Sequence, residues 1–417
     1  MVKSQDAFSW KDGNRPVCPI HSQVKLDILR TYIEAYFSTV AANPAIPVVN
    51  IHLVDAFAGG GVLKDPISGG PVAGSPFVML NTVHGAQQTI NASRTSTKLD
   101  IRARYHFADA SRSAVSELTR GIQASEYASK LHSGDIQIDR MKFDNYLPHL
   151  LGRIPSNEKT KALFFLDQCG WNIATLDHCN AILRHLPKAE IIWNISVESL
   201  ATFANENQDF RKGIERFGVD LGDAFTSQAS FNHFSDWRKS LIAIFLDKIR
   251  KGCDANYVSP FMVQHDGWGY WLLHLSNHPQ ANNVMKATHW QHQNHSLHEG
   301  FAGLKMLEFN RDNFHQTTMF RFDEAAGKST HEALFVELVP KLHELGGNVT
   351  RDDFVRAIAN ETPADVSRID SAFAELKEEG HVRIRGPKGE QRRGGPKHGQ
   401  DRISLPPQPK LFLPMSN

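Results

Sequence analysis

One apolar stretch that ends in an acid and a glycine cluster constrains the fold of this chain most strongly. Residues 48–58 are rich in apolar and β-branched side chains, Asp55 lies near their end, and glycines occupy positions 59, 60 and 61. Such a run is typical of a strand buried on both faces of a parallel sheet. Glycines let the backbone turn sharply and approach a ligand closely, although a purely structural turn is the alternative. Since ligands bind beyond the carboxyl ends of such strands, Asp55 is predicted to face a ligand site.

Length, charge and cysteine content limit the class of protein. A chain of 417 residues predicts two or three domains, and a net charge of +1 predicts that any nucleic-acid surface is local. No run approaches the length of a membrane span, and residues 1–10 lack an apolar signal core. The four cysteines form no CxxC pair, so we expect a cytoplasmic protein without disulfides or a zinc module. They are Cys18, Cys169, Cys179 and Cys253.

Apolar runs alternate with helical patterns through the first half of the chain. This alternation predicts an α/β fold with a mostly parallel, Rossmann-like sheet. Further strands are predicted at 103–109, 130–138, 162–167, 190–196 and 269–276, and helices at 24–40, 77–84, 111–122, 143–151 and 176–185. We interpret residues 62–74 as a long loop and residues 87–100 as a surface excursion.

The domain organisation follows from changes in pattern. Residues 1–46 are predicted to be a helical lead-in, and residues 47–325 the Rossmann-like domain. Residues 198–257 are helical in pattern and are interpreted as an insertion, a lid or a substrate-side subdomain. Residues 328–417 predict three helices followed by a β-ribbon, which is the winged-helix order. Within them, Thr350 and Asp353 have the spacing of a capping box.

Acids at the ends of successive predicted strands indicate a ligand site. Asp55, Asp109 and Asp167 have this position, and Asp135 is a further candidate. A carboxylate there can accept both hydroxyls of a ribose. The chain lacks G-x-G-x-x-G and the spacing of the nicotinamide fingerprint, which favours S-adenosylmethionine over a dinucleotide. The alternatives are that each acid caps the following helix, or that the acids bind metals for two-metal hydrolysis.

The segment from Asp167 to Trp171 lies where transfer chemistry is expected. Methyltransferases that modify amino groups of bases often use an acid or amide, then prolines and an aromatic ring. Here Gln168 replaces the first proline, and Trp171 is the stacking candidate. We interpret Cys169 as a small buried hydrophobe rather than a nucleophile.

Two groups of cationic or metal-binding side chains have competing interpretations. The histidines at 289, 292, 295 and 298 recur every third residue, but no second ligand set accompanies them, so we predict a solvated or pairing surface and no metal site. A basic, glycine-rich stretch in the predicted wing favours phosphate contacts, with a mobile surface or a protein-binding wing as the alternatives. Its cations are Arg383, Arg385, Lys388, Arg392, Arg393, Lys397 and Arg402.

The chain resembles the three-Cys-motif partner protein (TcmP) family over roughly its first 290 residues. The resemblance is carried by residues 21–32 (His21-Ser22-Gln23-Val24-Lys25, Ile28-Leu29-Arg30 and Tyr32), 54–61 (Val54-Asp55-Ala56-Phe57-Ala58-Gly59 and Gly61), 74–76, 165–170, 273–278 and 285–286. The family usually has Asp-Pro at the fourth strand, where this chain has Asp167-Gln168.

The resemblance implies a class I methyltransferase-type fold and a radical-SAM-like neighbour protein that bears three cysteines. On this basis Asp55 and Phe57 are expected among the cofactor-binding residues. Gly59 and Gly61 would give room to the methionine end of S-adenosylmethionine, Asp109 would bind the ribose and Asp135 the adenine amine. Asp167 and Trp171 would orient the acceptor, with Lys25 and Arg30 on the substrate side. The leading hypothesis is a methyltransferase that acts on nucleic acid. The alternatives are a non-catalytic partner with a vestigial pocket and a metal-dependent nuclease.

Overall fold

The computed structural model describes residues 10, 14–157, 159–168, 172–196, 208–219, 234–265, 268–292, 296–299, 302–304 and 319–407. The chain forms two units, one made of residues 1–298 and 309–322 and the other of residues 299–308 and 323–417. The boundary expected from the sequence, at 325–328, lies next to this division. Within the described ranges, no helix combines the length and the apolar character needed to cross a bilayer.

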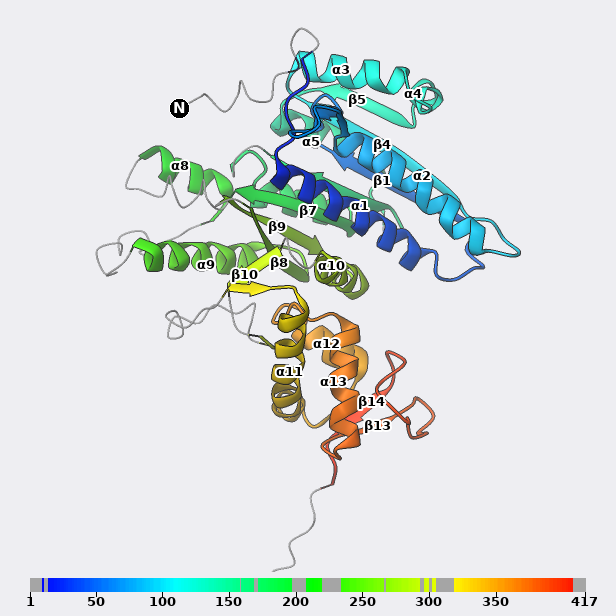
Figure 1. Ribbon diagram of the computed structural model, residues 1–417, viewed down its shortest axis with the longest axis vertical. Helices are drawn as coiled ribbons and strands as arrows, with labels where there is room; N and C mark the ends of the chain where they lie inside the picture. The colour runs from blue at the N-terminus through cyan, green and yellow to red at the C-terminus, as the bar shows by residue number, and fades with distance from the viewer. Residues whose placement is uncertain are drawn as a thin grey trace, which may run out of the picture. The chain divides into compact units, whose positions relative to one another are not determined.

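A nine-stranded sheet forms the centre of the first unit, in the order β11-β10-β8-β9-β7-β6-β1-β4-β5 (Figure 1). The five strands from β7 to β5 pair in parallel, whereas β9 is antiparallel to both β7 and β8. The predicted α/β fold with a mostly parallel central sheet is therefore confirmed. The strands are β1 (Val48–Asp55), β4 (Asp100–Asp109), β5 (Ile136–Arg140), β6 (Lys161–Leu166), β7 (Lys188–Ser196), β8 (Tyr257–His265), β9 (Trp268–Ser276), β10 (Ser296–Glu299) and β11 (Met319–Arg321).

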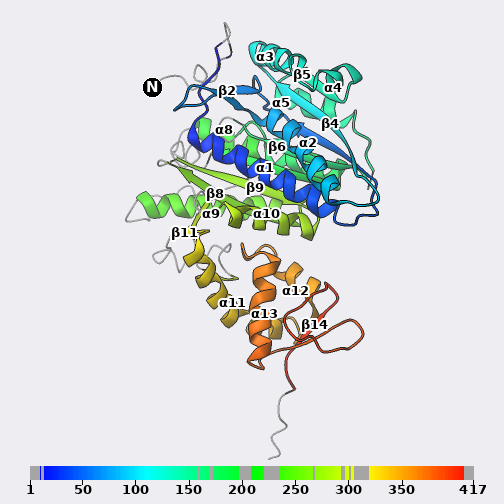
Figure 2. The ribbon, with the colours of Figure 1, turned by 45° about the vertical axis from the view of Figure 1, so that its right-hand side comes forward.

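Helices cover both faces of this sheet (Figure 2). One face carries α1 (Ile20–Val40), α2 (Ser75–Ser93) and α10 (Pro279–Gln291). The other carries α5 (Phe143–Leu151), α6 (Leu176–His185), α8 (Gln208–Phe217) and α9 (Phe234–Gly252). The helices α3 (Arg112–Gln123) and α4 (Ala128–Ser133) pack beside β4 and β5. Because both faces are covered, β6 and β7 are buried almost throughout, which explains their continuous apolar sequences.

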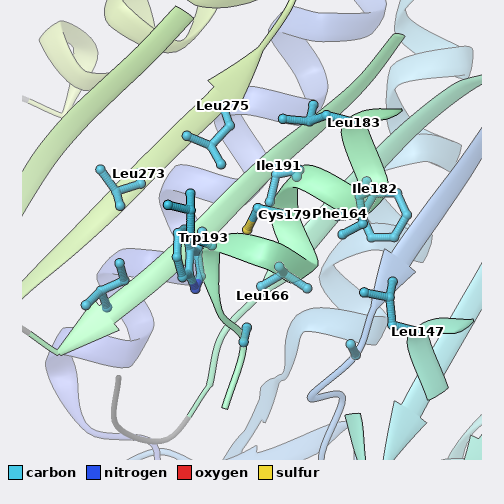
Figure 3. Packing of buried hydrophobic residues seen from close by; sticks show 14 of the residues in the cluster. Leu147, Phe164, Leu166, Cys179, Ile182, Leu183, Ile191, Trp193, Leu273 and Leu275 are labelled. Carbon is cyan, nitrogen blue, oxygen red and sulfur yellow. The ribbon is translucent and has the colours of Figure 1, made fainter. Parts of the chain in front are cut away.

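The apolar core between the sheet and α5, α6, α8 and α9 corrects one expectation (Figure 3). Phe217 of α8 stacks on Trp193 of β7 with ring centroids 5.0 Å apart, and Phe245 and Ile249 of α9 are fully buried. The predicted helices within 198–257 are present, but the interpretation of this segment as a lid is wrong for α8 and α9. They belong to the connection from β7 to β8, and their apolar faces complete the main core.

Three local expectations also differ from the structure. The strand predicted at 130–138 is wrong in its first half, because α4 ends at Gly134, which has a φ of +83°, before β5 begins. The surface excursion predicted for residues 87–100 is wrong for residues 87–93, which continue α2. The loop at 62–74 contains a hairpin of β2 (Val62–Lys64) and β3 (Pro71–Ala73). Each of these segments is short, so its periodicity did not distinguish helix from strand or loop.

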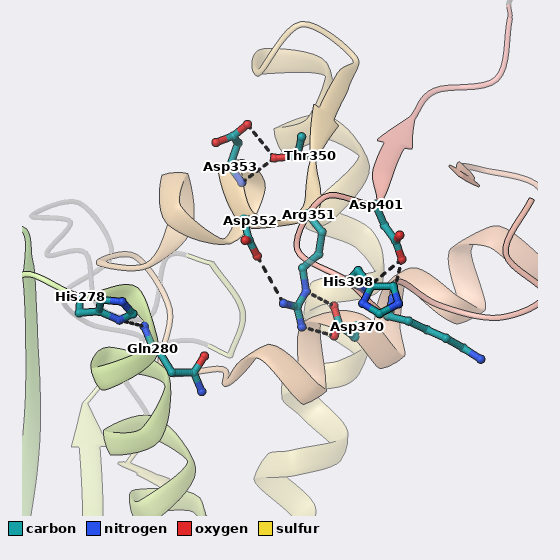
Figure 4. A network of polar contacts seen from close by, with 10 residues as sticks. His278, Gln280, Thr350, Arg351, Asp352, Asp353, Asp370, His398 and Asp401 are labelled. Atoms are coloured by element: carbon teal, nitrogen blue, oxygen red, sulfur yellow. Dashed lines mark hydrogen bonds and ion pairs between the residues drawn. The ribbon is translucent and has the colours of Figure 1, made fainter. Parts of the chain in front are cut away.

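The second unit contains three helices and a three-stranded antiparallel sheet. The helices are α11 (Glu324–Glu344), α12 (Arg351–Ile358) and α13 (Val366–Glu378), and the strands are β12 (Asn348–Thr350), β13 (Arg383–Arg385) and β14 (Arg402–Ser404). The expected start of α12 is confirmed, because Thr350 Oγ1 accepts a hydrogen bond from the Asp353 N–H at 3.1 Å (Figure 4). The sequence did not reveal β12, which is too short to show alternation.

A buried arginine donates hydrogen bonds to carbonyl oxygens near the end of α1 in the first unit. Arg94 is 7% exposed and donates to the carbonyl oxygens of Ala41, Asn43, Ile46 and Thr97. These carbonyls lie in the turn between α1 and β1 and in the segment after α2. One cation therefore supplies donors to the carbonyl at the end of α1, that of Ala41, and to three carbonyls of the connecting segments.

We predict that Arg94→Met lowers the free energy of unfolding by about 1–3 kcal/mol, because the buried Ala41 carbonyl and three less buried carbonyls lose their donor. Urea unfolding followed by circular dichroism measures the change. The matched control is Arg102→Met, whose ion pair with Asp100 is exposed and should contribute less than about 1 kcal/mol. Equal losses in the two variants would contradict this account of Arg94.

Candidate functional site

The carboxyl ends of three neighbouring strands form the candidate site. Asp55 is the last residue of β1, Asp109 is the last residue of β4, and Asp167 follows β6 directly. Because β1 pairs in parallel with both β4 and β6, these ends meet at one edge of the sheet. From β1 the chain builds outward to β4 and β5, then crosses to β6 on the other side. Such a reversal of strand order is where open α/β sheets bind ligands.

Asp55 is a carboxylate removed from water. It is 0% exposed, and burial raises its pKa to about 7. The Ser75 hydroxyl and the Phe57 N–H lower the pKa by less than burial raises it, and the charges of Asp167 and Asp109 add to the increase. The Phe57 N–H donates to Asp55 Oδ1 at 3.1 Å, whereas Oδ2 has no hydrogen-bond partner among the described residues. A buried acceptor without a donor is a common feature of ligand sites.

Asp109 fastens the glycine turn to the neighbouring strand. Its two carboxylate oxygens accept the N–H groups of Gly59 at 3.1 Å and Ser111 at 2.7 Å. Burial raises the pKa of Asp109, and these two hydrogen bonds oppose the increase. Gly59 and Gly61 have φ values of +57° and +80°, so the turn needs residues without a Cβ.

The indole of Trp10 packs on the same turn. A Cβ built on Gly59 would lie 2.7 Å from the Trp10 Cη2 atom, and one on Gly60 would overlap the indole more severely. The Trp10 Nε1–H donates to the carbonyl oxygen of Val62 at 3.4 Å. The glycines therefore have a structural role that the sequence did not reveal. For this reason the case for a cofactor depends on the carboxylates rather than on the glycines.

Asp167 belongs to a polar group contributed by three elements. Its Oδ1 atom accepts from Lys25 Nζ of α1 at 2.5 Å and from Asn194 Nδ2 of β7 at 2.7 Å. Lys25 is 5% exposed, and its ammonium group lies 5.0 Å from the ring centroid of Tyr270 on β9. From the sequence we expected Lys25 only on the substrate side of the site, and the structure places its ammonium group on Asp167. The sequence analysis missed Asn194, although a single amide in the apolar strand 190–196 was a usable signal.

Gln168 stabilises the loop that follows β6. Its Oε1 atom accepts the N–H groups of Ile173 and Ala174, each at 2.8 Å, and its Nε2 atom donates to the carbonyl oxygen of Asn194 at 3.2 Å. The side chain is 2% exposed. Gln168 therefore ties residues 173 and 174 to the backbone of β7.

Other predicted site residues lie elsewhere or outside the described ranges. Asp135 precedes β5, at the amino end of that strand, and its carboxylate accepts a hydrogen bond from the Ser133 hydroxyl at 2.8 Å. The structure does not bring it to the edge that holds Asp55. Arg30 pairs with Asp27 on the exposed side of α1. Trp171 and Cys169 lie outside the described residues.

The solvated or pairing surface predicted for the histidine series is wrong for His289. His289 is 0% exposed, and its ring stacks on Phe261 with centroids 3.5 Å apart. His292 Nε2 lies 2.8 Å from the Thr31 hydroxyl oxygen. His295 and the side chain of His298 lie outside the described part of the chain. Within that part, no three metal-ligating side chains form a group that can hold a metal.

The second unit carries a separate cationic surface on β13, β14 and the loop between them. We call it the basic ribbon. Its exposed cations are Arg383, Arg385, Lys388, Arg393, Lys397 and Arg402. Arg385 and Arg402 lie opposite each other in the antiparallel register. By contrast, the exposed face of α13 carries Ser367, Ser371, Glu375 and Glu378.

Arg392 differs from the other predicted cations because it holds the loop together. Its guanidinium donates to both oxygens of the fully buried Asp401, at 2.6 and 3.0 Å. Burial of Asp401 opposes ionisation, but hydrogen bonds from Arg392 and from the N–H groups of Lys397 and His398 lower its pKa to about 2. Arg351 makes a similar bidentate pair with Asp370 of α13 (Figure 4).

Comparisons with known proteins add little to this geometry. No family model matches the chain, and no curated protein does. Among solved structures, it is similar to the crystal structure of protein LPL1258 from Legionella pneumophila str. Philadelphia 1, described as family-model DUF519. The identity is 11% and the TM-score 0.33, over 60% of this chain and 85% of that one. A likeness of this size carries no argument about function.

We predict that Asp55→Asn stabilises the protein increasingly as the pH rises. The folded-state pKa of about 7 lies above the ordinary value of 3.8, so the unfolded chain ionises first and wild-type stability falls between these values. The variant's advantage should grow by about 1.4 kcal/mol per pH unit between pH 4 and 7 and then level off. Thermal melts at several pH values measure it, with the exposed Asp27→Asn as control. A difference independent of pH would contradict the burial argument.

Proposed function

We propose that the protein is an S-adenosylmethionine-dependent methyltransferase that acts on nucleic acid. The observation that carries the proposal is the meeting of Asp55, Asp109 and Asp167 at the ends of adjacent parallel strands. They lie where the strand order reverses, which is the ligand position in sheets of this kind.

The sheet order supports a class I methyltransferase-type, Rossmann-like fold. Numbered along the chain, the seven strands β5-β4-β1-β6-β7-β9-β8 have the order 3-2-1-4-5-7-6. The first five follow the doubly wound Rossmann order. The seventh strand is inserted antiparallel between the fifth and sixth, as in the class I methyltransferase type.

The residues at the edge fit the parts of this cofactor. Each oxygen of Asp109 accepts one backbone N–H and keeps a second acceptor position for a ribose hydroxyl. The ring of Phe57 packs on the buried Phe143 with centroids 5.2 Å apart, and Phe57 is only partly buried, so it offers apolar contact to the cofactor. Asp55 Oδ2 is a buried oxygen without a hydrogen-bond partner among the described residues, and we propose that the ammonium group of the cofactor donates to it. When bound, S-adenosylmethionine supplies an electrophilic methyl group, and the chain's contribution is to position the acceptor beside it.

The second unit supports nucleic acid as the acceptor. Three helices followed by a β-ribbon are the winged-helix arrangement, with the basic ribbon as its wing. The exposed arginines and lysines of the basic ribbon can neutralise the charges of a phosphate backbone. The face of α13 bears glutamates, so we propose that the ribbon, rather than this helix, binds the phosphates. The family resemblance adds a neighbour protein with three cysteines as a proposed partner.

One observation favours a second function, a non-catalytic nucleic-acid-binding partner with a vestigial pocket. Trp10 packs on the glycine turn where the methionine end of the cofactor is expected. A metal-dependent nuclease has less support, because the described residues bring no metal-binding group together.

Binding and turnover should separate in two variants. Asp109→Ala is expected to lower affinity for S-adenosylmethionine and S-adenosylhomocysteine at least about 100-fold in calorimetric titrations, because the ribose loses its acceptor. Asp167→Ala should retain binding and lose methyl transfer. Asp100→Ala, at the exposed opposite end of β4, is the control and should behave like wild type. Wild-type turnover in both site variants would overturn the methyltransferase proposal.

The basic ribbon should set the salt dependence of nucleic-acid binding. Arg385→Gln and Lys397→Gln are each expected to reduce the slope of log affinity against log salt by about 1. Fluorescence anisotropy with a labelled random-sequence duplex measures the slope. Lys328→Gln removes a cation that is 81% exposed on α11, outside the ribbon, and should leave the slope unchanged. Identical slopes in all proteins would exclude the ribbon as the contact surface.

A further inference from the structure

We propose that Asp167 Oδ2 and Asn194 Oδ1 form an acceptor pair for the exocyclic amino group of a nucleobase. Lys25 is then the positioning residue that holds Asp167. This inference rests on the proposed methyltransferase function and names the chemical group that receives the methyl.

The orientation of the Asn194 amide is determined by its partner. An ionised carboxylate only accepts hydrogen bonds, so the group 2.7 Å from Asp167 Oδ1 is the amide NH2. The amide oxygen, Asn194 Oδ1, therefore points away from Asp167 Oδ1. Asn194 is 2% exposed, and this oxygen has no hydrogen-bond partner among the described residues. A buried acceptor without a donor costs free energy, which a donor from a ligand would recover.

Asp167 contributes the more accessible acceptor. Both of its hydrogen bonds within the described part of the chain, from Lys25 and Asn194, end on Oδ1. Its side chain is 24% exposed, whereas that of Lys25 is 6% exposed. Lys25 thus approaches from within the fold and leaves Oδ2 as an acceptor. Since a buried ammonium needs a compensating charge, the pair also holds the carboxylate in one place.

Two neighbouring acceptors match an amino group better than other methyl acceptors of nucleic acids. An NH2 group has two donors, a ribose hydroxyl has one and a ring carbon has none. Tyr270 of β9 lies beside Lys25 and His21, with ring centroids of Tyr270 and His21 5.0 Å apart. An aromatic ring near the acceptors is suited to stacking of a planar base.

The acceptor pair also provides a base for the proton that the amine loses on methylation. The lone pair of the amine nitrogen forms the new N–C bond to the methyl group, and the electrons of the broken C–S bond remain on sulfur. The amine then carries a positive charge and loses one proton. Asp167 accepts that proton and passes it to water, while Asn194 keeps the nitrogen aligned.

The product identifies the acceptor directly. Full-length protein is incubated with methyl-labelled S-adenosylmethionine and a mixture of random-sequence DNA and RNA oligonucleotides, which are then digested to nucleosides for mass spectrometry. We expect the label on an exocyclic nitrogen of adenine, cytosine or guanine, in DNA or RNA. Label on a ring carbon or a ribose oxygen would overturn this inference and leave the methyltransferase function standing. Cofactor binding without label in any nucleoside would overturn both.

Variants test the roles of the two supporting residues. Asn194→Leu is expected to lower kcat/KM for the nucleic acid about 100-fold, with affinity for S-adenosylmethionine within about twofold of wild type. Lys25→Met should behave alike, and Lys25→Arg should recover part of the loss because it restores the cation. The control is Lys188→Met, at the exposed amino end of β7. A purely structural role predicts instead that cofactor affinity and melting temperature fall together with turnover, and that result would overturn the assignment.

Discussion

The burial of the carboxyl half of β1 on both faces, where Leu53, Val54 and Asp55 are fully buried, is the constraint on which the first unit depends. Its neighbours β4 and β6 supply the backbone partners, and helices cover both faces of the sheet. The strand ends in Asp55, a carboxylate with no cation beside it among the described contacts, and burial raises its pKa accordingly. A fold that accepts this cost has a reason to keep the group. We propose that this reason is ligand recognition at the reversal of strand order.

The helix α1 connects the stability of the sheet to the candidate site. Near its beginning, Lys25 reaches Asp167 at the carboxyl end of β6. About two turns later, Tyr32 donates a hydrogen bond to Glu190 near the amino end of β7. Burial, followed by the charge of Glu190, raises the pKa of Tyr32, so the phenol stays a donor. These two polar contacts fix the position of α1 along the strands, and with it the position of the cation at the site.

In the second unit, two arginines form ion pairs that hold the structure together, whereas the other cations of the basic ribbon are exposed. The buried pair of Arg392 and Asp401 holds the loop of the basic ribbon, and the pair of Arg351 and Asp370 joins α12 to α13. The remaining cations of the ribbon are exposed. From the sequence we predicted that Arg392 contacts phosphate. The sequence does not show which partner a charged side chain in a loop will have.

The sequence by itself determined the class of fold and the strand-end acids. The apolar stretches that end in Asp55, Asp109 and Asp167 predict parallel strands, because the residues near the carboxyl ends of these strands are buried on both faces. Tertiary structure alone decided which groups surround those acids. Trp10, Lys25 and Asn194 reach the site from distant parts of the chain, and Asp135 falls at the opposite end of its strand. Local periodicity records which face of an element is apolar, but contacts between distant segments depend on how whole elements pack.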